Sequence, residues 1–143
     1  MKKNFKWIDT CHTINWNDLS NLYKIAPLGD KSPQALETVF KNSMFKYFIY
    51  YNDKLIGAGR ALADGVDCSY ICDVAIHPDY QGLGLGKAMM EKLIEYSKGH
   101  AKIILYVVPT KEPFYAKFGF TKMKTAMAIF KNQEWAREKG LVE

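Results

Sequence analysis

The chain has 143 residues, 48% of them hydrophobic and 24% charged, and it carries a formal net charge of +5. This length gives one domain with its own core and is too short for two ordinary domains, and the composition is that of a folded protein rather than a disordered one. The sequence has no apolar run of membrane-spanning length and no apolar block behind its N-terminal lysines. We therefore expect a cytoplasmic protein without a signal peptide, folded as a single domain over residues 1–143.

The cysteines and the charge argue against two further classes of protein. Cys11, Cys68 and Cys72 are odd in number and lack C-x-x-C spacing, so neither a disulfide framework nor a zinc site is expected. The lysines are scattered along the chain rather than clustered. Nucleic acid therefore stays an alternative partner that the sequence does not favour.

The first third of the chain predicts one short strand and two helices. Residues 3–9 are expected to form the strand. Residues 15–26 place their apolar side chains on one face of a helix that ends before a proline. The second helix begins at Ser32-Pro33, a hydroxyl N-cap followed by proline at the first helical position, and runs to about Lys41.

Three strands follow, linked by tight turns. Residues 45–51 are aromatic and β-branched, and the turn after them leads into residues 55–63. Asp64-Gly65 is a second hairpin signal. Residues 68–76 come next and are largely apolar, so we expect them inside the sheet rather than at its edge.

The second half of the chain predicts one parallel crossover. A helix from Leu85 to Gly99, with Tyr96 on its apolar face, separates residues 68–76 from a buried strand at residues 102–108. A strand, a crossover helix and a second strand give two parallel neighbours joined right-handedly.

The C-terminal part of the chain predicts three short elements. These are a helix that ends at Gly119, a strand at residues 125–130 and a helical turn at residues 133–139. With antiparallel hairpins first and one parallel crossover in the middle, the fold class is mixed α/β, of the α+β type.

Three glycines stand where the crossover helix begins, in the stretch QGLGLGK (81–87). Glycine weakens a helix by about 1 kcal/mol relative to alanine. The first turn of a helix, however, presents unpaired N–H groups and the positive end of the helix dipole, which together bind phosphate, and glycine lets a ligand approach them closely. The spacing fits neither the P-loop nor the dinucleotide fingerprint, and it does fit Gln81-x-x-Gly84-x-Gly86.

With this motif the chain resembles the GNAT superfamily, the Gcn5-related N-acetyltransferases, whose acyl-CoA pyrophosphate loop has this spacing. The surrounding DVAIHPDYQGLGLGKAMMEKLI (73–94) has the superfamily's strand, loop and helix, and FYAKFGF (114–120) has its later aromatic segment. Gly57-Ala58-Gly59-Arg60 is similar to a motif of small bacterial members. The resemblance implies a mixed central sheet with splayed parallel strands flanked by helices, with acetyl-CoA (coenzyme A) as co-substrate and no metal.

The resemblance also implies the contacts of coenzyme A. The backbone of Val74, Ala75 and Ile76 is expected to pair with the pantetheine arm like an added strand. The N–H groups of residues 82–87 are expected to bind the pyrophosphate, and the side chains at the two ends of the loop to add contacts. The cofactor-binding residues of the loop are therefore Gln81, Gly82, Leu83, Gly84, Leu85, Gly86 and Lys87. Lys87 has an equal alternative as an exposed helix lysine.

Tyr115 matches the tyrosine of the superfamily's aromatic segment that faces the sulfur of coenzyme A. Transfer of an acetyl group to an amine releases a thiolate, and the resemblance implies that the phenol donates a proton or a hydrogen bond to it. The alternative is a core aromatic packed beside Phe114, Phe118 and Phe120.

Asp73 is a second catalytic candidate, because a carboxylate in the middle of an interior strand is unfavourable unless it is paired. Arg60 on the preceding strand is the expected partner, and the pair is either structural or part of the acceptor site. A bulge in the strand would exchange its two faces, so the pattern leaves this choice open. Tyr70 and Cys72 are expected to line the acceptor side beside Arg60.

The predicted function is transfer of an acetyl group from acetyl-CoA to a primary amine by direct attack, without a covalent acyl-enzyme. The acceptor is a small-molecule or peptide amine that the sequence does not identify, and no general base is evident. The alternatives are a non-catalytic acyl-CoA-binding module and a nucleic-acid-associated protein. The sequence does not decide whether the protein forms a homodimer, for which exposed edge strands would be suited. No membrane partner is expected.

Overall fold

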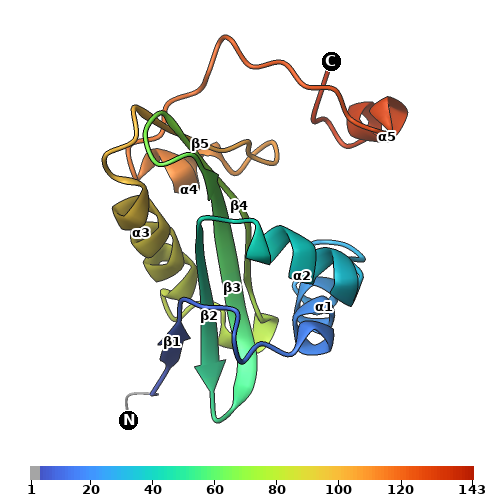
Figure 1. The fold of residues 1–143 in the computed structure, drawn as a ribbon. Helices are drawn as coiled ribbons and strands as arrows, with labels where there is room; N and C mark the ends of the chain where they lie inside the picture. Colours follow the sequence, from blue (N-terminus) through green and yellow to red (C-terminus); the bar gives the residue numbers. More distant parts are fainter. Residues whose placement is uncertain (1–3) are drawn as a thin grey trace. The chain divides into compact units, whose positions relative to one another are not determined.

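The structure is a computed structural model that describes residues 4–143 of the chain. Its contacts divide the chain into two compact units, one ending at Leu105 and the other running from Tyr106 to Glu143. The first unit holds the sheet and the helices that cover it, and the second holds two short helices (Figure 1).

The first unit is built on a mixed five-stranded sheet, whose strands lie in the order in which they occur along the chain. Their bounds are Lys6–Ile8 (β1), Phe45–Tyr51 (β2), Lys54–Ala63 (β3), Cys68–Ile76 (β4) and Lys102–Ile104 (β5). Pairing is antiparallel from β1 to β4 and parallel between β4 and β5, which confirms the predicted hairpins and the crossover. β1 lies within the predicted strand 3–9, of which residue 3 is outside the described residues.

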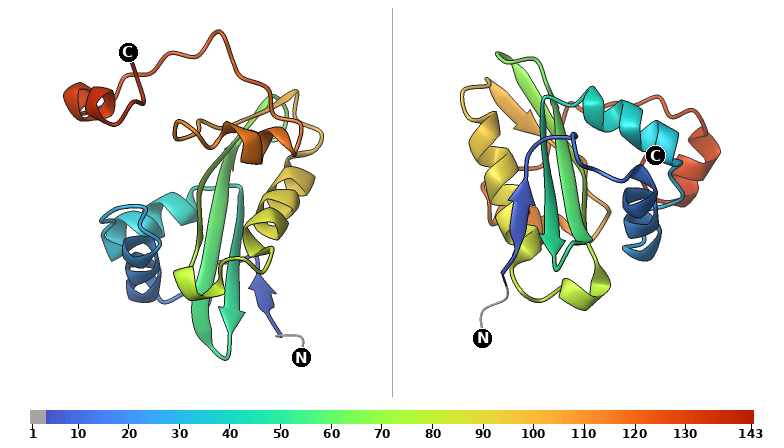
Figure 2. Two further views of the ribbon diagram at one scale, coloured as in Figure 1. Left: turned by 180° about the vertical axis from the view of Figure 1, so that it is seen from behind. Right: turned by 60° about the horizontal axis from the view of Figure 1, so that its bottom comes forward.

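Helices cover both faces of this sheet, with α1 and α2 on one face and α3 on the other (Figure 2). Their bounds are Trp16–Ile25 for α1, Pro33–Lys41 for α2, Pro78–Tyr80 for the 3-10 turn η1 and Leu85–Ser97 for α3. The predicted N-cap of α2 is present, since Ser32 Oγ accepts a hydrogen bond from the N–H of Ala35 at 3.1 Å.

The larger core lies between the sheet and the pair formed by α1 and α2. Its buried members from the two layers are Leu19, Leu22, Tyr23, Leu36, Phe40, Phe48, Leu55, Ala58 and Ala75. On the opposite face, Met89 and Leu93 of α3 pack over Gly59, where a Cβ would lie only 3.0 Å from the Met89 sulfur. Gly59 therefore allows α3 to approach β3 closely.

Three details of the sequence predictions are wrong. β5 occupies only the first part of the predicted strand 102–108, and residues 125–130 form no strand, with Met127 and Ile129 98% and 96% exposed. A strand needs a partner for its backbone groups, and local β-propensity does not reveal whether one is present. Tyr96, predicted on the buried face of α3, is 40% exposed, and its hydroxyl donates a hydrogen bond to Asp9 at the surface.

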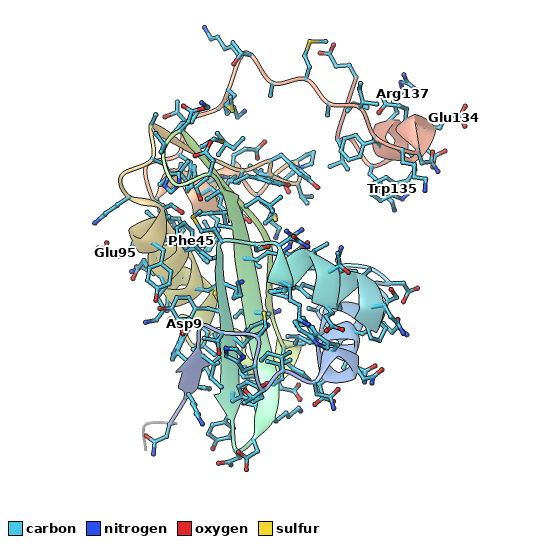
Figure 3. All side chains as sticks on the ribbon, in the orientation of Figure 1. Asp9, Phe45, Glu95, Glu134, Trp135 and Arg137 are labelled. Atoms are coloured by element: carbon cyan, nitrogen blue, oxygen red, sulfur yellow. The ribbon has the colours of Figure 1, made fainter. Side chains whose placement is uncertain are left out.

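In the second unit, α4 (Glu112–Ala116) and α5 (Gln133–Glu138) confirm the predicted short helix and terminal turn. Gly119 has a φ of +100°, so the chain turns where the sequence predicts the end of the short helix. The side chain of Asn132 caps α5, and Figure 3 shows the side chains of that helix, Trp135 among them. None of the helices within residues 4–143 combines the length and the apolar character needed to cross a membrane.

Candidate active site

β4 and β5 stop pairing partway along β4. Their parallel register runs from the Cys68–Lys102 pair to the Tyr70–Ile104 pair. β4 then continues to Ile76 with β3 on one side, and within residues 4–143 no strand pairs with its other side there. The sheet therefore opens between its two parallel strands, beside the backbone of residues 74–76.

The loop after β4 leads directly into the N-terminus of α3. Gly82 and Gly84 have φ values of +79° and +80°, which glycine adopts without strain. A Cβ on either residue would meet no described atom within 4 Å, so the space beside the loop and the N-cap of α3 is open. Gly84 is the N-cap and offers no side chain to the first N–H groups of the helix. This arrangement fits a bound pyrophosphate group.

Gly86 differs from these two glycines because it lies inside α3 with an ordinary helical backbone. A Cβ at this position would lie 3.9 Å from Ile76 Cγ1, which is ordinary van der Waals contact. Neither backbone conformation nor packing within the described residues therefore requires glycine here. Space for a ligand against the first turn of the helix is a sufficient reason for it.

We expect Gly86→Ala to raise the free energy of unfolding by about 0.5–1 kcal/mol, because alanine is the better helix former. Urea denaturation measures this change. Gly99→Ala is the matched control and should lower the free energy of unfolding, because Gly99 has a φ of +99° and an alanine there is strained. A Gly86→Ala protein less stable than wild type would mean that the protein itself, and not a ligand, requires this glycine.

The two polar side chains of the loop have partners in the first unit. Gln81 Nε2 donates a hydrogen bond to the carbonyl of Ile76 at 3.1 Å, which ties the loop to the end of β4. Lys87 lies 3.7 Å from Glu91 in an exposed pair one turn along α3. Both contacts are compatible with ligand binding, and neither requires it.

Asp73 sits in a bulge of β4. Arg60 faces Cys72 and Ala58 faces Ala75, so Gly59 alone stands opposite Asp73 and Val74. Asp73 has a φ of +55°, in the left-handed region that few non-glycine residues adopt.

The predicted ion pair between Arg60 and Asp73 is present in the structure. Arg60 Nε lies 2.8 Å from Asp73 Oδ2, and the two side chains are only 12% and 20% exposed. Lys31 Nζ lies 3.7 Å from the other carboxylate oxygen, Asp73 Oδ1. The carboxylate therefore has two cations beside it. Their positive charges offset its attraction for a cationic substrate, which is weaker than that of an unpaired carboxylate.

The remaining acceptor-side candidates lie along the same strand. Burial raises the pKa of the Cys72 thiol to about 11, so at neutral pH it is not a thiolate nucleophile. Tyr70 pairs in register with Leu62 on one side and Ile104 on the other. The structure thus brings Arg60, Cys72 and Asp73 together, and places Tyr70 at the last residue before the sheet opens.

Tyr115 belongs to the second unit, on α4. Its ring centroid lies 5.1 Å from that of Phe114 and 6.4 Å from that of Phe120. The side chain is half-buried, and this burial raises the pKa of its phenol. The hydroxyl is therefore protonated at neutral pH, as a hydrogen-bond donor must be.

Three residues of this region were missed by sequence reasoning as parts of the site. Tyr23 donates a hydrogen bond to the Asp73 carbonyl, Lys31 approaches the Asp73 carboxylate, and Ser43 Oγ accepts one from Arg60. For Tyr23 a signal exists, because a tyrosine on a buried helix face must find a partner for its hydroxyl. Within residues 4–143, no group of three or more His, Cys, Asp or Glu side chains is placed to hold a metal ion.

Known proteins of similar sequence and fold are named as acetyltransferases. The chain is an acetyl-CoA-dependent N-acetyltransferase. Residues 3–120 match the sequence profile described as the acetyltransferase (GNAT) family, and the chain belongs to this family.

Individual relatives agree with this assignment. The chain is 35% identical to the "uncharacterized N-acetyltransferase ycf52" of Pyropia yezoensis, over 85% of this chain and 83% of that one. It is similar to the structure of SA2161, a probable acetyltransferase of meticillin-resistant Staphylococcus aureus, with 27% identity, a TM-score of 0.79 and coverage of 90% and 100% of the two chains. Naa50 of Arabidopsis thaliana, solved with the bisubstrate analogue CoA-Ac-MVNAL, shares the fold at a TM-score of 0.69 and 22% identity, over 84% and 85% of the two chains. Some relatives carry the word chloroplastic in their names.

Proposed function

We propose that this enzyme holds the pyrophosphate of acetyl-CoA at the N-terminus of α3 and the pantetheine arm along β4. The open space at Gly82 and Gly84 is the observation that carries the proposal, because a glycine N-cap without a side-chain hydrogen bond leaves the first N–H groups of α3 for an anion. The edge of residues 74–76 beyond the last β4–β5 pair supports the second contact, since an extended ligand can pair with it as a strand does.

The proposed reaction is a single displacement. The lone pair of a neutral amine attacks the thioester carbonyl carbon, the C–N bond forms, the C–S bond breaks and the amine proton leaves to water. A lysine-like amine has a pKa of about 10.4, so only its small neutral fraction reacts at pH 7. Tyr115 donates its proton to the departing thiolate and regains one from solvent. The raised pKa of Cys72 supports direct attack, because this thiol is not ionised to accept the acetyl group itself.

We further propose that residues 1–143 act as one catalytic domain. The GNAT profile matches residues 3–120, so a single family match includes both the glycine loop and Tyr115. Enzymes of this family act on small-molecule or peptide amines, and a peptide N-terminus is one acceptor to test, since the Naa50 structure holds an analogue of that kind. A homodimer and a cytoplasmic location are secondary proposals that rest on sequence reasoning, and a size-exclusion mass measurement decides the first of them.

A screen of primary amines, amino acids and short peptides with acetyl-CoA tests the proposed function. We expect thiol release that depends on one class of amine, with the N-acetyl product identified by mass spectrometry. Acetyl-CoA binding without release for any amine would instead support the non-catalytic acyl-CoA-binding module. Salt-dependent binding to RNA or duplex DNA, without acetyl transfer, would support the nucleic-acid-associated alternative.

A further inference from the structure

The bulge of β4 holds a non-glycine residue in the left-handed region. Asp73 is the one residue of β4 with a positive φ, and it is not glycine. Residues held in sparsely populated backbone regions persist only where their surroundings hold them there. The contacts of Asp73 therefore indicate which groups stabilise the strand in this shape.

The first contact comes from α1. Tyr23 is fully buried, and its hydroxyl donates a 2.5 Å hydrogen bond to the main-chain carbonyl of Asp73, 50 positions along the chain. Burial, with the nearby Asp73 charge, raises the pKa of Tyr23 well above its usual value, so the donor proton is present at every physiological pH. The bond acts on the backbone at the bulge, where the φ value is unusual.

The second contact comes from α2 by way of Arg60. The guanidinium donates to the Asp73 carboxylate at 2.8 Å and to Ser43 Oγ at 3.2 Å, and Ser43 donates in turn to the carbonyl of Val39 at 2.6 Å. Arg60 also lies 6.0 Å from the centre of the Phe40 ring. Both helices on this face of the sheet are thus linked to a single residue of β4, one to its main chain and one to its side chain.

We propose that Tyr23 is a positioning residue that holds the β4 bulge in register for acetyl transfer. A bulge changes the direction in which the following backbone groups point. The residues that follow, Val74 to Ile76, form the edge on which the proposed function places the pantetheine arm, so this inference rests on that function. A displacement of about 1 Å of a reacting group can lower a rate roughly 100-fold. Loss of the Tyr23 hydroxyl therefore affects the reaction through the shape of β4.

Hydrogen exchange of single amides in the Tyr23→Phe variant tests the first half of the proposal. We expect faster exchange at Val74–Ile76 and unchanged exchange in β2, because only the bulge loses a contact. Tyr47→Phe is the matched control, since it removes a tyrosine hydrogen bond of 2.7 Å to Tyr96, away from β4. Two results would overturn the proposal. Unchanged exchange at Val74–Ile76 would mean that the hydroxyl does not stabilise the bulge, and a uniform rise over the whole sheet would mean that it stabilises the fold as a whole.

Steady-state kinetics test the second half. We expect Tyr23→Phe to lower kcat at least about tenfold and to raise the Kd for coenzyme A by a smaller factor, because the α3 loop that holds the pyrophosphate is intact while the edge at Val74–Ile76 is displaced. In an Asp73→Gly background the same substitution has a smaller effect, because glycine adopts the bulge conformation unaided. An equal loss in both backgrounds would contradict the positioning role and indicate independent packing.

The exchange and kinetic experiments together distinguish failure of the Tyr23 proposal from failure of the proposed function. If the wild-type enzyme acetylates no amine, the proposed function fails while the exchange experiment still decides whether Tyr23 holds the bulge. If Asp73→Gly is inactive, Asp73 has a direct role in the reaction and the exchange result alone decides for Tyr23. A Tyr23→Phe variant with the kcat of the wild-type enzyme would contradict the positioning role of Tyr23 and would leave the proposed function unaffected.

Discussion

Gly84→Glu is expected to abolish the rise in melting temperature that acetyl-CoA gives the wild-type protein. A ligand that binds only the folded state at 100 times its Kd stabilises that state by about 2.7 kcal/mol. The new side chain and its negative charge would occupy the open space beside the loop and the N-cap of α3, where we place the pyrophosphate. Thermal unfolding with and without acetyl-CoA measures the change.

Gly99→Glu is the matched control for this variant. Gly99 also has a positive φ, and a Cβ there would also meet no described atom within 4 Å, so both substitutions strain the backbone in a similar way. Gly99 lies beyond the C-terminal end of α3, so this variant should keep the full response to acetyl-CoA. A folded Gly84→Glu protein with a wild-type response would refute the assignment of the loop.

Tyr115→Phe should keep the fold and the affinity for acetyl-CoA while lowering kcat. Only one oxygen is lost, and its interaction forms mainly as the C–S bond breaks, so the loss falls on the transition state. General-acid help is worth about 10²–10⁴-fold, and we expect at least a roughly tenfold loss even where water partly substitutes. Steady-state thiol release with a competent amine gives kcat, and calorimetry gives the Kd of acetyl-CoA.

Phe120→Leu is the packing control for Tyr115. The Phe120 ring lies against that of Tyr115, so this variant disturbs the aromatic group without removing a hydroxyl. It should lower the melting temperature and leave kcat close to that of the wild-type enzyme. A Tyr115→Phe enzyme with wild-type kcat would leave Tyr115 as a core aromatic and the catalysis to positioning alone.

Elements with strong local signals could be predicted from the sequence almost to the residue. The hydroxyl at Ser32 and the proline after it predict the start of α2, and the glycines before Leu85 predict the start of α3. The predicted strands at residues 102–108 and 125–130 depended on partners elsewhere in the chain. The first is shorter than its β-propensity suggested and the second is absent, because a ladder forms between strands and not within one.

The candidate site likewise has parts with a clear sequence signal and parts that depend on residues far apart in the chain. The glycine-rich connection between β4 and α3 could be predicted, since its signal lies within a few consecutive residues, and its binding of acetyl-CoA stays a prediction. The Arg60–Asp73 pair could also be predicted, because a carboxylate inside a strand requires a partner on a neighbouring one. The bond from Tyr23 to the Asp73 carbonyl could not, because it joins residues 50 positions apart and acts on a main-chain atom that has the same chemistry in every residue.

A single-turnover reaction with isotopically labelled acetyl-CoA and a competent amine tests direct transfer by this enzyme most directly. Quenched samples are divided between product analysis and mass measurement of the intact protein. We predict that the labelled N-acetyl amine appears at the rate at which coenzyme A is released, and that the protein never gains the mass of an acetyl group. Labelled acetyl-protein that forms first and then decays into product, or release of coenzyme A without any N-acetyl product, would contradict direct transfer.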